Sequence, residues 1–191
     1  MSAIDDSATR SDEDLVRCFQ QTGAVAPLNE LVARHSGTIR SLVYHMVLND
    51  ADADDLSQEI LLRALRALPE FQHRSQFSTW LYRIAMNVTR SFLTARARSP
   101  LQATDPLPET RDPAAPKPDR HLLERELDAE IVIALGELPP KLRAALVLTA
   151  IHGLAVVDAA RVEHCVLPTM YWRIHQARKQ LHVRLARYLT S

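Results

Sequence analysis

The stretch DADADDLSQEILLRALRALPEFQHRSQFSTWLYRIAMN (residues 50–87) decides the fold. Leu56 and Ile60 recur in it at a spacing of four, the repeat of one apolar helix face. We expect this helix to open at Asp52 or Asp54, because an aspartate accepts hydrogen bonds from the free N–H groups of a first turn. Strand signals are weak throughout the chain, so the sequence predicts an all-α fold.

Beyond Pro69 we expect a loop at residues 71–78 and then a long helix from about residue 79 to residue 97. Leu81 and Ile84 would face the core from this helix. Apolar residues at helical spacings also run from Leu15 to Met46. Further helices are expected at about residues 119–136, 141–152, 156–162 and 168–188.

A proline-rich segment divides the chain. Six of the eleven prolines fall in SPLQATDPLPETRDPAAPKPD (residues 99–119), and proline at that density bars helix and leaves an extended connector. We therefore expect two small helical domains joined by a proline-rich linker. The expected boundaries are an acidic tail at 1–13, a helical bundle at 14–98, the linker at 99–118 and a second helical domain at 119–191.

Composition excludes several classes of protein. Of the 191 residues, 47% are hydrophobic and 24% charged, as in ordinary globular proteins. Cys18 and Cys165 lie far apart and form no CxxC pair, which favours a reduced protein without a structural disulfide. The start lacks the pattern of a signal peptide, and the longest apolar run is too short to span a bilayer. A cytoplasmic protein is expected.

The net charge is zero, but the charges are segregated along the chain. Residues 71–104 contain no acid, five arginines and five of the ten aromatic residues, and residues 164–191 contain no acid either. Arginines meet phosphates and aromatic rings stack on exposed bases, so these segments suit nucleic acid. The acidic cluster at residues 50–59 would repel nucleic acid and instead suits a basic protein surface.

Within the acidic cluster, Asp52, Asp54 and Asp55 are explained by the stabilising effect of negative charge at a helix N-terminus. Glu59 is not, because it repeats Asp55 at i+4, where like charges cost about 0.2–0.5 kcal/mol. Asp54, Asp55, Gln58 and Glu59 form a continuous polar ridge opposite the apolar face. A solvated face is the alternative, but a protein-docking ridge is favoured.

The loop and the helix after it combine aromatic, amide and basic side chains. The rings can fill a small core, and for Phe71 and Trp80 that reading holds in part. They can also stack on an unpaired base whose polar edge is read by nearby side chains, two of them on the following helix. The candidate contacts are Phe71, His73, Arg74, Gln76, Phe77, Trp80, Asn87 and Arg90.

The last two expected helices have helix-turn-helix proportions, which predicts a second helix in the major groove. An amphipathic basic helix is also typical of ordinary surface helices, so both readings stay open. The candidate DNA contacts are Thr169, Met170, Arg173, His175, Gln176, Arg178 and Lys179.

Metal and catalytic patterns are missing from the sequence. Glu70 and His73 form a single Glu-x-x-His match where a di-metal bundle needs two, and the other histidines lack ligand spacing. No phosphate-binding loop or nucleophile motif occurs. We expect a binding protein that is not an enzyme, with no catalytic residue, no metal and no cofactor.

Three motifs occur in order along the chain: DADDLSQEILLRA (52–64), FSTWLYRIAMN (77–87) and IHQARKQL (174–181). They resemble, respectively, the polymerase-binding helix, the FxTWLYRIAxN segment and the end of the promoter-reading helix of extracytoplasmic-function (group IV) sigma factors of bacterial RNA polymerase. The resemblance runs from about Asp14 to Leu189, interrupted by the linker. It implies a sigma-2-like helical bundle and a sigma-4-like helix-turn-helix domain.

The resemblance also implies roles and partners. Asp52, Asp54, Asp55, Gln58 and Glu59 would dock on the β′ clamp helices of core RNA polymerase. The loop with Asn87 would capture a flipped base of the minus-ten promoter element. The region 164–187 would read the minus-thirty-five element while its domain rests on the β flap. Members of this family are usually held inactive by an anti-sigma factor, often a membrane protein, without entering the membrane themselves.

The chain departs from the family pattern at three places. His164 stands where the family turn has glycine, so it needs an unusual turn backbone or a local rearrangement. Tyr171 and Trp172 replace small or basic residues, so the core, a partner or DNA remain open for them. Val156 and Val157 add apolar surface. The rival function is a stand-alone helix-turn-helix regulator, which leaves the acidic ridge and the aromatic loop unexplained.

Overall fold

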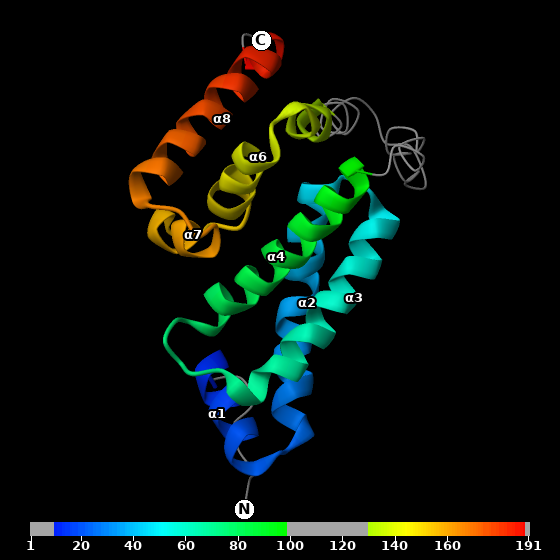
Figure 1. Ribbon diagram of the computed structural model, residues 1–191, viewed down its shortest axis with the longest axis vertical. Coiled ribbons are helices and arrows are strands. Elements are labelled where there is room, and N and C mark those ends of the chain that lie inside the picture. The colour runs from blue at the N-terminus through cyan, green and yellow to red at the C-terminus, as the bar shows by residue number, and fades with distance from the viewer. Residues whose placement is uncertain (1–9, 99–129, 190–191) are drawn as a thin grey trace, which may run out of the picture.

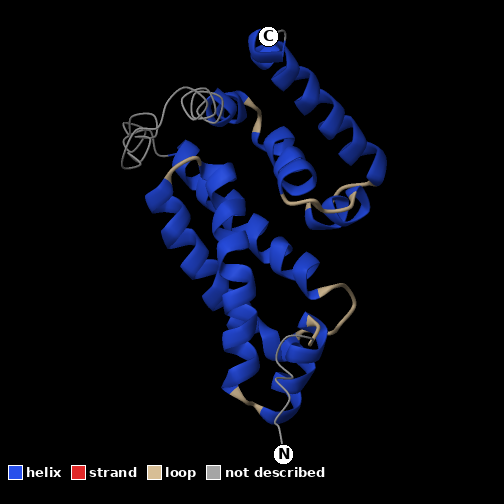
Figure 2. Cartoon of the chain, turned by 180° about the vertical axis from the view of Figure 1, so that it is seen from behind, coloured by secondary structure: helices blue, strands red, loops and turns tan. Residues whose placement is uncertain are grey.

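The computed structural model describes residues 10–98 and 130–189. The acidic tail up to residue 9, the expected linker and the start of the helix expected from residue 119 lie outside the described residues. All regular structure in the described part of the chain is helical, as expected (Figure 2). None of the described helices is long and apolar enough to cross a membrane.

The N-terminal bundle has four helices and a short 3-10 turn (Figure 1). They are α1 (Asp12–Thr22), α2 (Val25–Val47), α3 (Asp50–Ala67), η2 (Leu68–Glu70) and α4 (Phe77–Arg98). The second module begins with helical residues 130–137. It continues through α6 (Pro140–Leu146), a π-helical turn η4 (Val147–Ile151), α7 (Val156–Val162) and α8 (Leu167–Leu189).

Local chemistry explains the helix ends. The Ser11 side chain accepts from the backbone N–H of Asp14 and caps α1, which ends at Gly23 in the left-handed conformation with φ 66°. The expectation that α3 opens at Asp52 or Asp54 was late by two or more residues. Asn49 is the cap, and its side chain accepts from the N–H of Asp52 at 2.9 Å. Likewise α4 begins at Phe77 rather than at residue 79.

The apolar residues of the bundle lie where the spacing predicted. Ile39, Leu42 and Val43 of α2 are fully buried, as is Ile60 of α3. Leu81 of α4 completes this core. Burial of such side chains is worth about 1.5–3 kcal/mol each, so this core holds the bundle together.

The two modules pack against each other. Buried residues of η4, α7 and α8 belong to the same apolar cluster as the core of the bundle, and α7 lies beside α4 (Figure 1). Arg143 of α6 makes a polar joint: its guanidinium donates to the backbone oxygens of Met46 at 2.6 Å and Gly136 at 2.7 Å. Burial lowers the pKa of Arg143.

Candidate functional site

The acidic ridge lies on the solvent side of α3. Asp54, Asp55, Gln58 and Glu59 are exposed, whereas residues on the opposite face of the helix, such as Leu56, are buried. A 3.6-residue repeat therefore presents these side chains in one row along the helix. The exposure is what a docking surface requires.

Two arginines from neighbouring helices partly neutralise the acidic cluster at residues 50–59, which the sequence did not indicate. Arg40 of α2 donates to Asp54 and to Asp50, and these carboxylates raise its pKa. Asp52 is half-buried and pairs with Arg96 near the end of α4. Asp55 forms no ion pair with another described residue, so it is the freest carboxylate of the ridge.

The aromatic loop is built around buried rings. Phe71 is 6% exposed and Phe77 4% exposed, and their ring centroids lie 5.0 and 5.6 Å from that of Trp80. Phe71 and Phe77 were predicted to contact DNA, but in this structure the bundle covers their faces. Trp80 is half-buried. The three rings pack together beneath the loop and support it from the core side.

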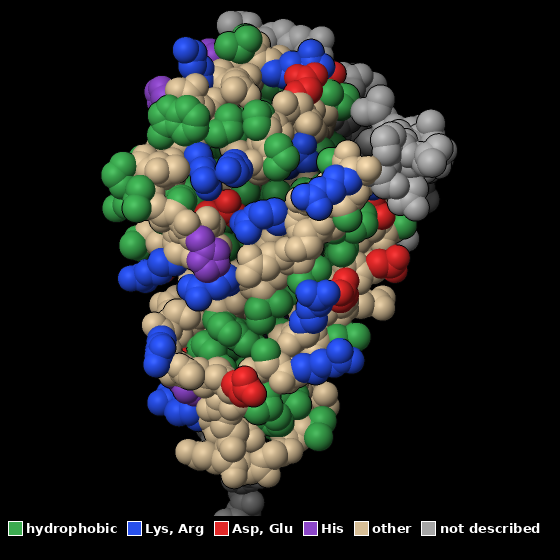
Figure 3. Space-filling view, viewed as in Figure 1, with side chains coloured by type: hydrophobic (Ala, Val, Ile, Leu, Met, Phe, Trp, Pro, Cys, Tyr) green, Lys and Arg blue, Asp and Glu red, His purple; other side chains and the backbone are tan. Residues whose placement is uncertain are grey.

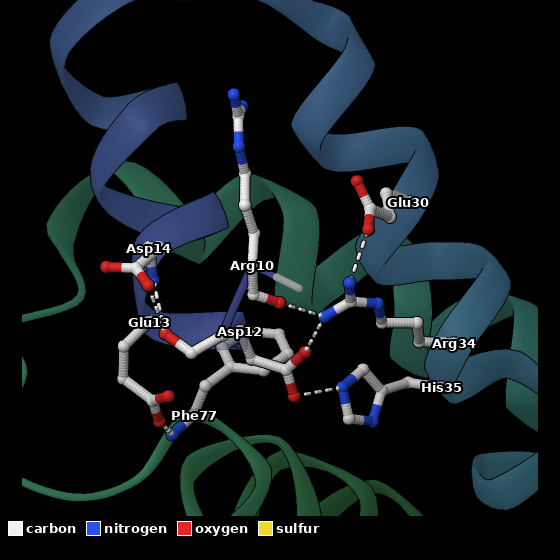
Figure 4. Close-up of polar contacts among 9 residues, drawn as sticks. Arg10, Asp12, Glu13, Asp14, Glu30, Arg34, His35 and Phe77 are labelled. Atoms are coloured by element: carbon white, nitrogen blue, oxygen red, sulfur yellow. Dashed lines mark hydrogen bonds and ion pairs between the residues drawn. The ribbon is translucent and has the colours of Figure 1, made fainter. Parts of the chain in front are cut away.

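Side chains of α1 fix both ends of this loop. A carboxylate oxygen of Glu13 accepts the free backbone N–H of Phe77 at 3.0 Å and so caps α4 (Figure 4). The Gln20 amide donates to the backbone oxygens of Leu68 and Phe71, and its oxygen lies 2.9 Å from Nε2 of His73. Sequence reasoning missed Glu13 and Gln20, since no spacing rule places α1 beside a loop fifty residues away.

The same network holds α1 against α2. Asp12 accepts from Arg34 at 3.0 Å and lies 2.7 Å from Nε2 of His35 (Figure 4). The ring of His35 in turn meets the edge of Phe77, with centroids 5.3 Å apart. The loop is thus braced by charged side chains on one side and by ring contacts on the other.

Polar side chains of the loop and of α4 reach the surface. His73, Arg74 and Gln76 are exposed, and so are Asn87 and Arg90 on α4. Asn87 follows Phe77 by ten residues, or about 15 Å of helix rise. The loop and the Asn87–Arg90 pair are therefore well separated along α4, whereas the sequence predicted that they line one pocket.

Arg90 is joined to the second module through Glu163. Its Nη2 lies 2.7 Å from one oxygen of Glu163, and the other oxygen lies 3.2 Å from Nη1 of Arg173. The Glu163 side chain is only 3% exposed. A buried carboxylate requires such partners, and here they are two of the arginines expected to meet DNA. Sequence reasoning missed Glu163 entirely.

The helix-turn-helix is present in α7 and α8. Between them, His164 adopts a left-handed backbone conformation with φ 50°, so the expectation of an unusual turn at this histidine is confirmed. Met170 is completely buried with Ile174 and Ala177. Met170 was predicted to contact DNA, but in this structure it lies on the core face of α8.

The remaining candidates on α8 divide by exposure. His175, Arg178 and Lys179 are exposed, while Thr169, Arg173 and Gln176 are half-buried. Tyr171 and Trp172 lie in solvent rather than in the core. Val157 is exposed as expected, whereas Val156 packs against the core.

Charge and apolar surface combine on one face of the molecule. Figure 3 shows Lys and Arg side chains across its middle, over α4 and the adjoining second module, and hydrophobic side chains gathered near α7 and the start of α8. Among the described residues, no group of three or more His, Cys, Asp or Glu side chains could hold a metal ion. The basic surface over α4 and the second module is suited to binding a polyanion.

Comparison with known proteins defines the class. Residues 31–99 match the Sigma-70 region 2 family and residues 129–181 match the Sigma-70 region 4 family. The RNA polymerase sigma-H factor of Pseudomonas aeruginosa is 34% identical over 89% of this chain and 91% of its own. The ECF RNA polymerase sigma-E factor of Escherichia coli K12 is 32% identical over 90% and 92%. This chain belongs to the extracytoplasmic-function sigma factors of the sigma-70 family.

Solved structures agree with this assignment. The structure of CnrH in complex with the cytosolic domain of CnrY has a TM-score of 0.69 and 26% identity, covering 92% of this chain and 97% of CnrH. The sigma factor RpoE of Bartonella quintana, solved with the anti-sigma factor NepR, has a TM-score of 0.65 at 23% identity, covering 83% and 96%. The second likeness supports the fold alone.

Proposed function

We propose that this chain binds core RNA polymerase through the α3 ridge and directs it to promoters. The bundle at 14–98 would bind polymerase and the minus-ten element, and the domain at 119–191 would bind the minus-thirty-five element. It would act in the cytoplasm as an initiation factor, without catalysing a reaction. The observation that carries the proposal is the exposed ridge of α3 on the same bundle as the basic surface of α4.

The contacts follow from exposure and chemistry. Asp55, Gln58 and Glu59 would face a basic surface of polymerase, with Asp54 joining them if Arg40 releases it. His73, Arg74 and Gln76 would meet one part of the melted minus-ten strand and Asn87 another, because stacking and hydrogen bonding both need exposed groups. Phe71 and Phe77 would support this loop from the core rather than contact DNA themselves.

An anti-sigma factor is the second expected partner. It is supported by family membership and by the CnrH structure, in which a sigma factor is bound by the cytosolic domain of CnrY. Such a partner would compete with core polymerase for this chain. A pull-down on core polymerase with the partner present measures that competition, and an undiminished yield of this chain would contradict it.

Charge reversal tests the polymerase contact. Asp55→Arg combined with Glu59→Arg should lower retention on immobilised core polymerase at least tenfold, since like charges would face each other across the interface. Glu70→Arg is the matched control, because Glu70 is an exposed acid of the same bundle outside the ridge. Equal retention of the double variant and the control would defeat the proposal, and a chain that never binds polymerase would favour the stand-alone regulator.

A further inference from the structure

The outer face of α8 carries an aromatic pair that none of the roles above uses. Trp172 is 59% exposed and Tyr171 is 57% exposed, although both begin a helix whose other side is fully packed. Trp172, His175 and Lys179 recur at i, i+3 and i+7 and define this outer face, opposite the buried residues of the helix. A large apolar side chain held in solvent at such a position calls for a ligand.

The charges around the aromatic pair indicate what that ligand is. From residue 164 to the end of the chain there is no acid. Lys179 lies on the outer face with Trp172, and Arg178 lies on the flank beside Tyr171, seven residues further along. An apolar ring among cations matches a polyanion that also offers apolar groups. The DNA major groove is such a surface, because each thymine places a C5-methyl group there.

The rest of the helix has few other base readers in its first turns. Met170 is buried, and Arg173 is 12% exposed at its side chain and turned to Glu163. In a helix-turn-helix, the N-terminal residues of the second helix contact base edges. Trp172 is the sixth residue of α8 and the largest side chain on its outer face. Its position and size make it the residue that enters the groove first.

We infer that Trp172 is a specificity-determining residue that reads thymine methyl groups in the upstream promoter element, an inference that rests on the proposed function. Lys179, two turns further along the same face, contacts phosphate. Tyr171 and Arg178 line the flank of the groove. The element is therefore selected for thymine opposite the start of α8, with no arginine–guanine contact from the first two turns.

The test uses the holoenzyme formed from the full chain and core polymerase. Selection from a random duplex library first defines the upstream element. Each thymine of that element is then replaced in turn by uracil, which removes only the methyl group, and holoenzyme binding is measured. At one or two positions the wild-type protein should lose about fourfold in affinity, the equivalent of about 0.8 kcal/mol for a methyl-sized apolar group.

Trp172→Ala should bind the thymine promoter about as weakly as the wild type binds the uracil one, and should itself be insensitive to uracil. Val183→Ala is the matched control, because Val183 is 73% exposed and lies three turns further along α8. It should keep both affinity and uracil sensitivity. Circular dichroism of each variant reports whether α8 remains folded.

Three outcomes overturn the inference: a selected element without thymine, a wild-type holoenzyme insensitive to uracil, and a Trp172→Ala holoenzyme as uracil-sensitive as the wild type. If Trp172→Ala abolishes binding of a protein partner while leaving promoter affinity intact, the outer face binds a protein helix and the inference is also overturned. A chain that fails to join core polymerase defeats the proposed function instead. The two failures are thus distinguishable.

Discussion

The α3 ridge and the basic surface of α4 and α8 differ in how far their charged side chains are paired within the protein. The ridge faces solvent, and its freest carboxylate, Asp55, has no ion pair within the described chain. On the basic side, Arg90 and Arg173 share the buried carboxylate of Glu163, which ties the bundle to the second module. Asp55 is therefore accessible to a partner as the structure stands, whereas Arg90 and Arg173 are both engaged by Glu163.

Removing Glu163 should have the largest effect, because it frees both arginines of the basic surface. In Glu163→Ala the two arginines lose a shared buried partner, and we expect the free energy of unfolding to fall by about 3 kcal/mol, at the low end of values for broken buried pairs because Arg90 is half-exposed. Chemical denaturation measures this loss. Small-angle X-ray scattering should show a larger radius as α7 separates from α4.

Asp158→Ala is the control for Glu163→Ala. Asp158 lies on α7, the helix that Glu163 directly follows, and pairs with Arg161, whose side chain is 60% exposed. A surface pair of this kind contributes about 0–1 kcal/mol, so this variant should remain as compact as the wild type. If Glu163→Ala is as stable and as compact as the control, the shared ion pair does not hold the modules together.

The Arg143 joint gives the next largest effect. Arg143→Met keeps the apolar volume but leaves the backbone oxygens of Met46 and Gly136 without their donor. We expect a loss of about 1.5–3 kcal/mol, the usual range for hydrogen bonds to a charged group. Thermal denaturation measures it, with Lys141→Met on the exposed side of the same helix as control. No difference between the two variants would contradict the joint.

The sequence predicted the helices and the ridge but not these joints. Periodic apolar residues such as Leu56 and Ile60 report a buried face, because one helix contains the whole pattern. Glu163 and Arg143 act across modules, and a single charged residue in a helix turn carries no local signal of its distant partner. The same limit explains why Glu13 and Gln20, which support the aromatic loop from α1, were missed.

The burial of three predicted DNA contacts has a common physical cause. Phe71 and Phe77 were predicted to contact DNA because aromatic rings can stack on an unpaired base, and Met170 because it lies on the predicted groove helix. Each is apolar and lies on the side of its element that meets the core, so burial outweighs the character of its neighbours. Sequence patterns thus indicated which segments carry exposed charged and polar groups but could not separate the buried residues of those segments from the exposed ones.

His152 allows the contact between the modules to be tested by pH. Its ring lies 6.2 Å from that of His45 in α2 and 6.0 Å from that of Tyr82 in α4, centroid to centroid. Burial, with a smaller effect of His45, lowers the pKa of His152 to about 4. The unfolded chain, with the ordinary value of about 6.5, therefore binds the proton more readily.

It follows that His152 does not change stability above pH 6.5 and lowers it progressively as the pH falls from 6.5 to 4. Urea denaturation at pH 7.5 and pH 5 measures this loss. His152→Leu should reduce the difference between the two pH values, because it removes the titrating ring. If the variant shows the same pH dependence as the wild type, other groups are responsible.

The smallest expected effect concerns Arg40, which pairs with carboxylates of the acidic cluster. Arg40 occupies Asp54 and Asp50 from within the bundle, so Arg40→Ala frees two carboxylates for a basic partner. Both ion pairs are at least one-third exposed, so stability should fall by no more than about 1 kcal/mol. Affinity for core polymerase should rise about threefold, because the partner no longer competes with Arg40. Arg63→Ala, which frees only Glu59, should give a smaller rise, and a fall in affinity for Arg40→Ala would mean that Arg40 orders the ridge rather than masks it.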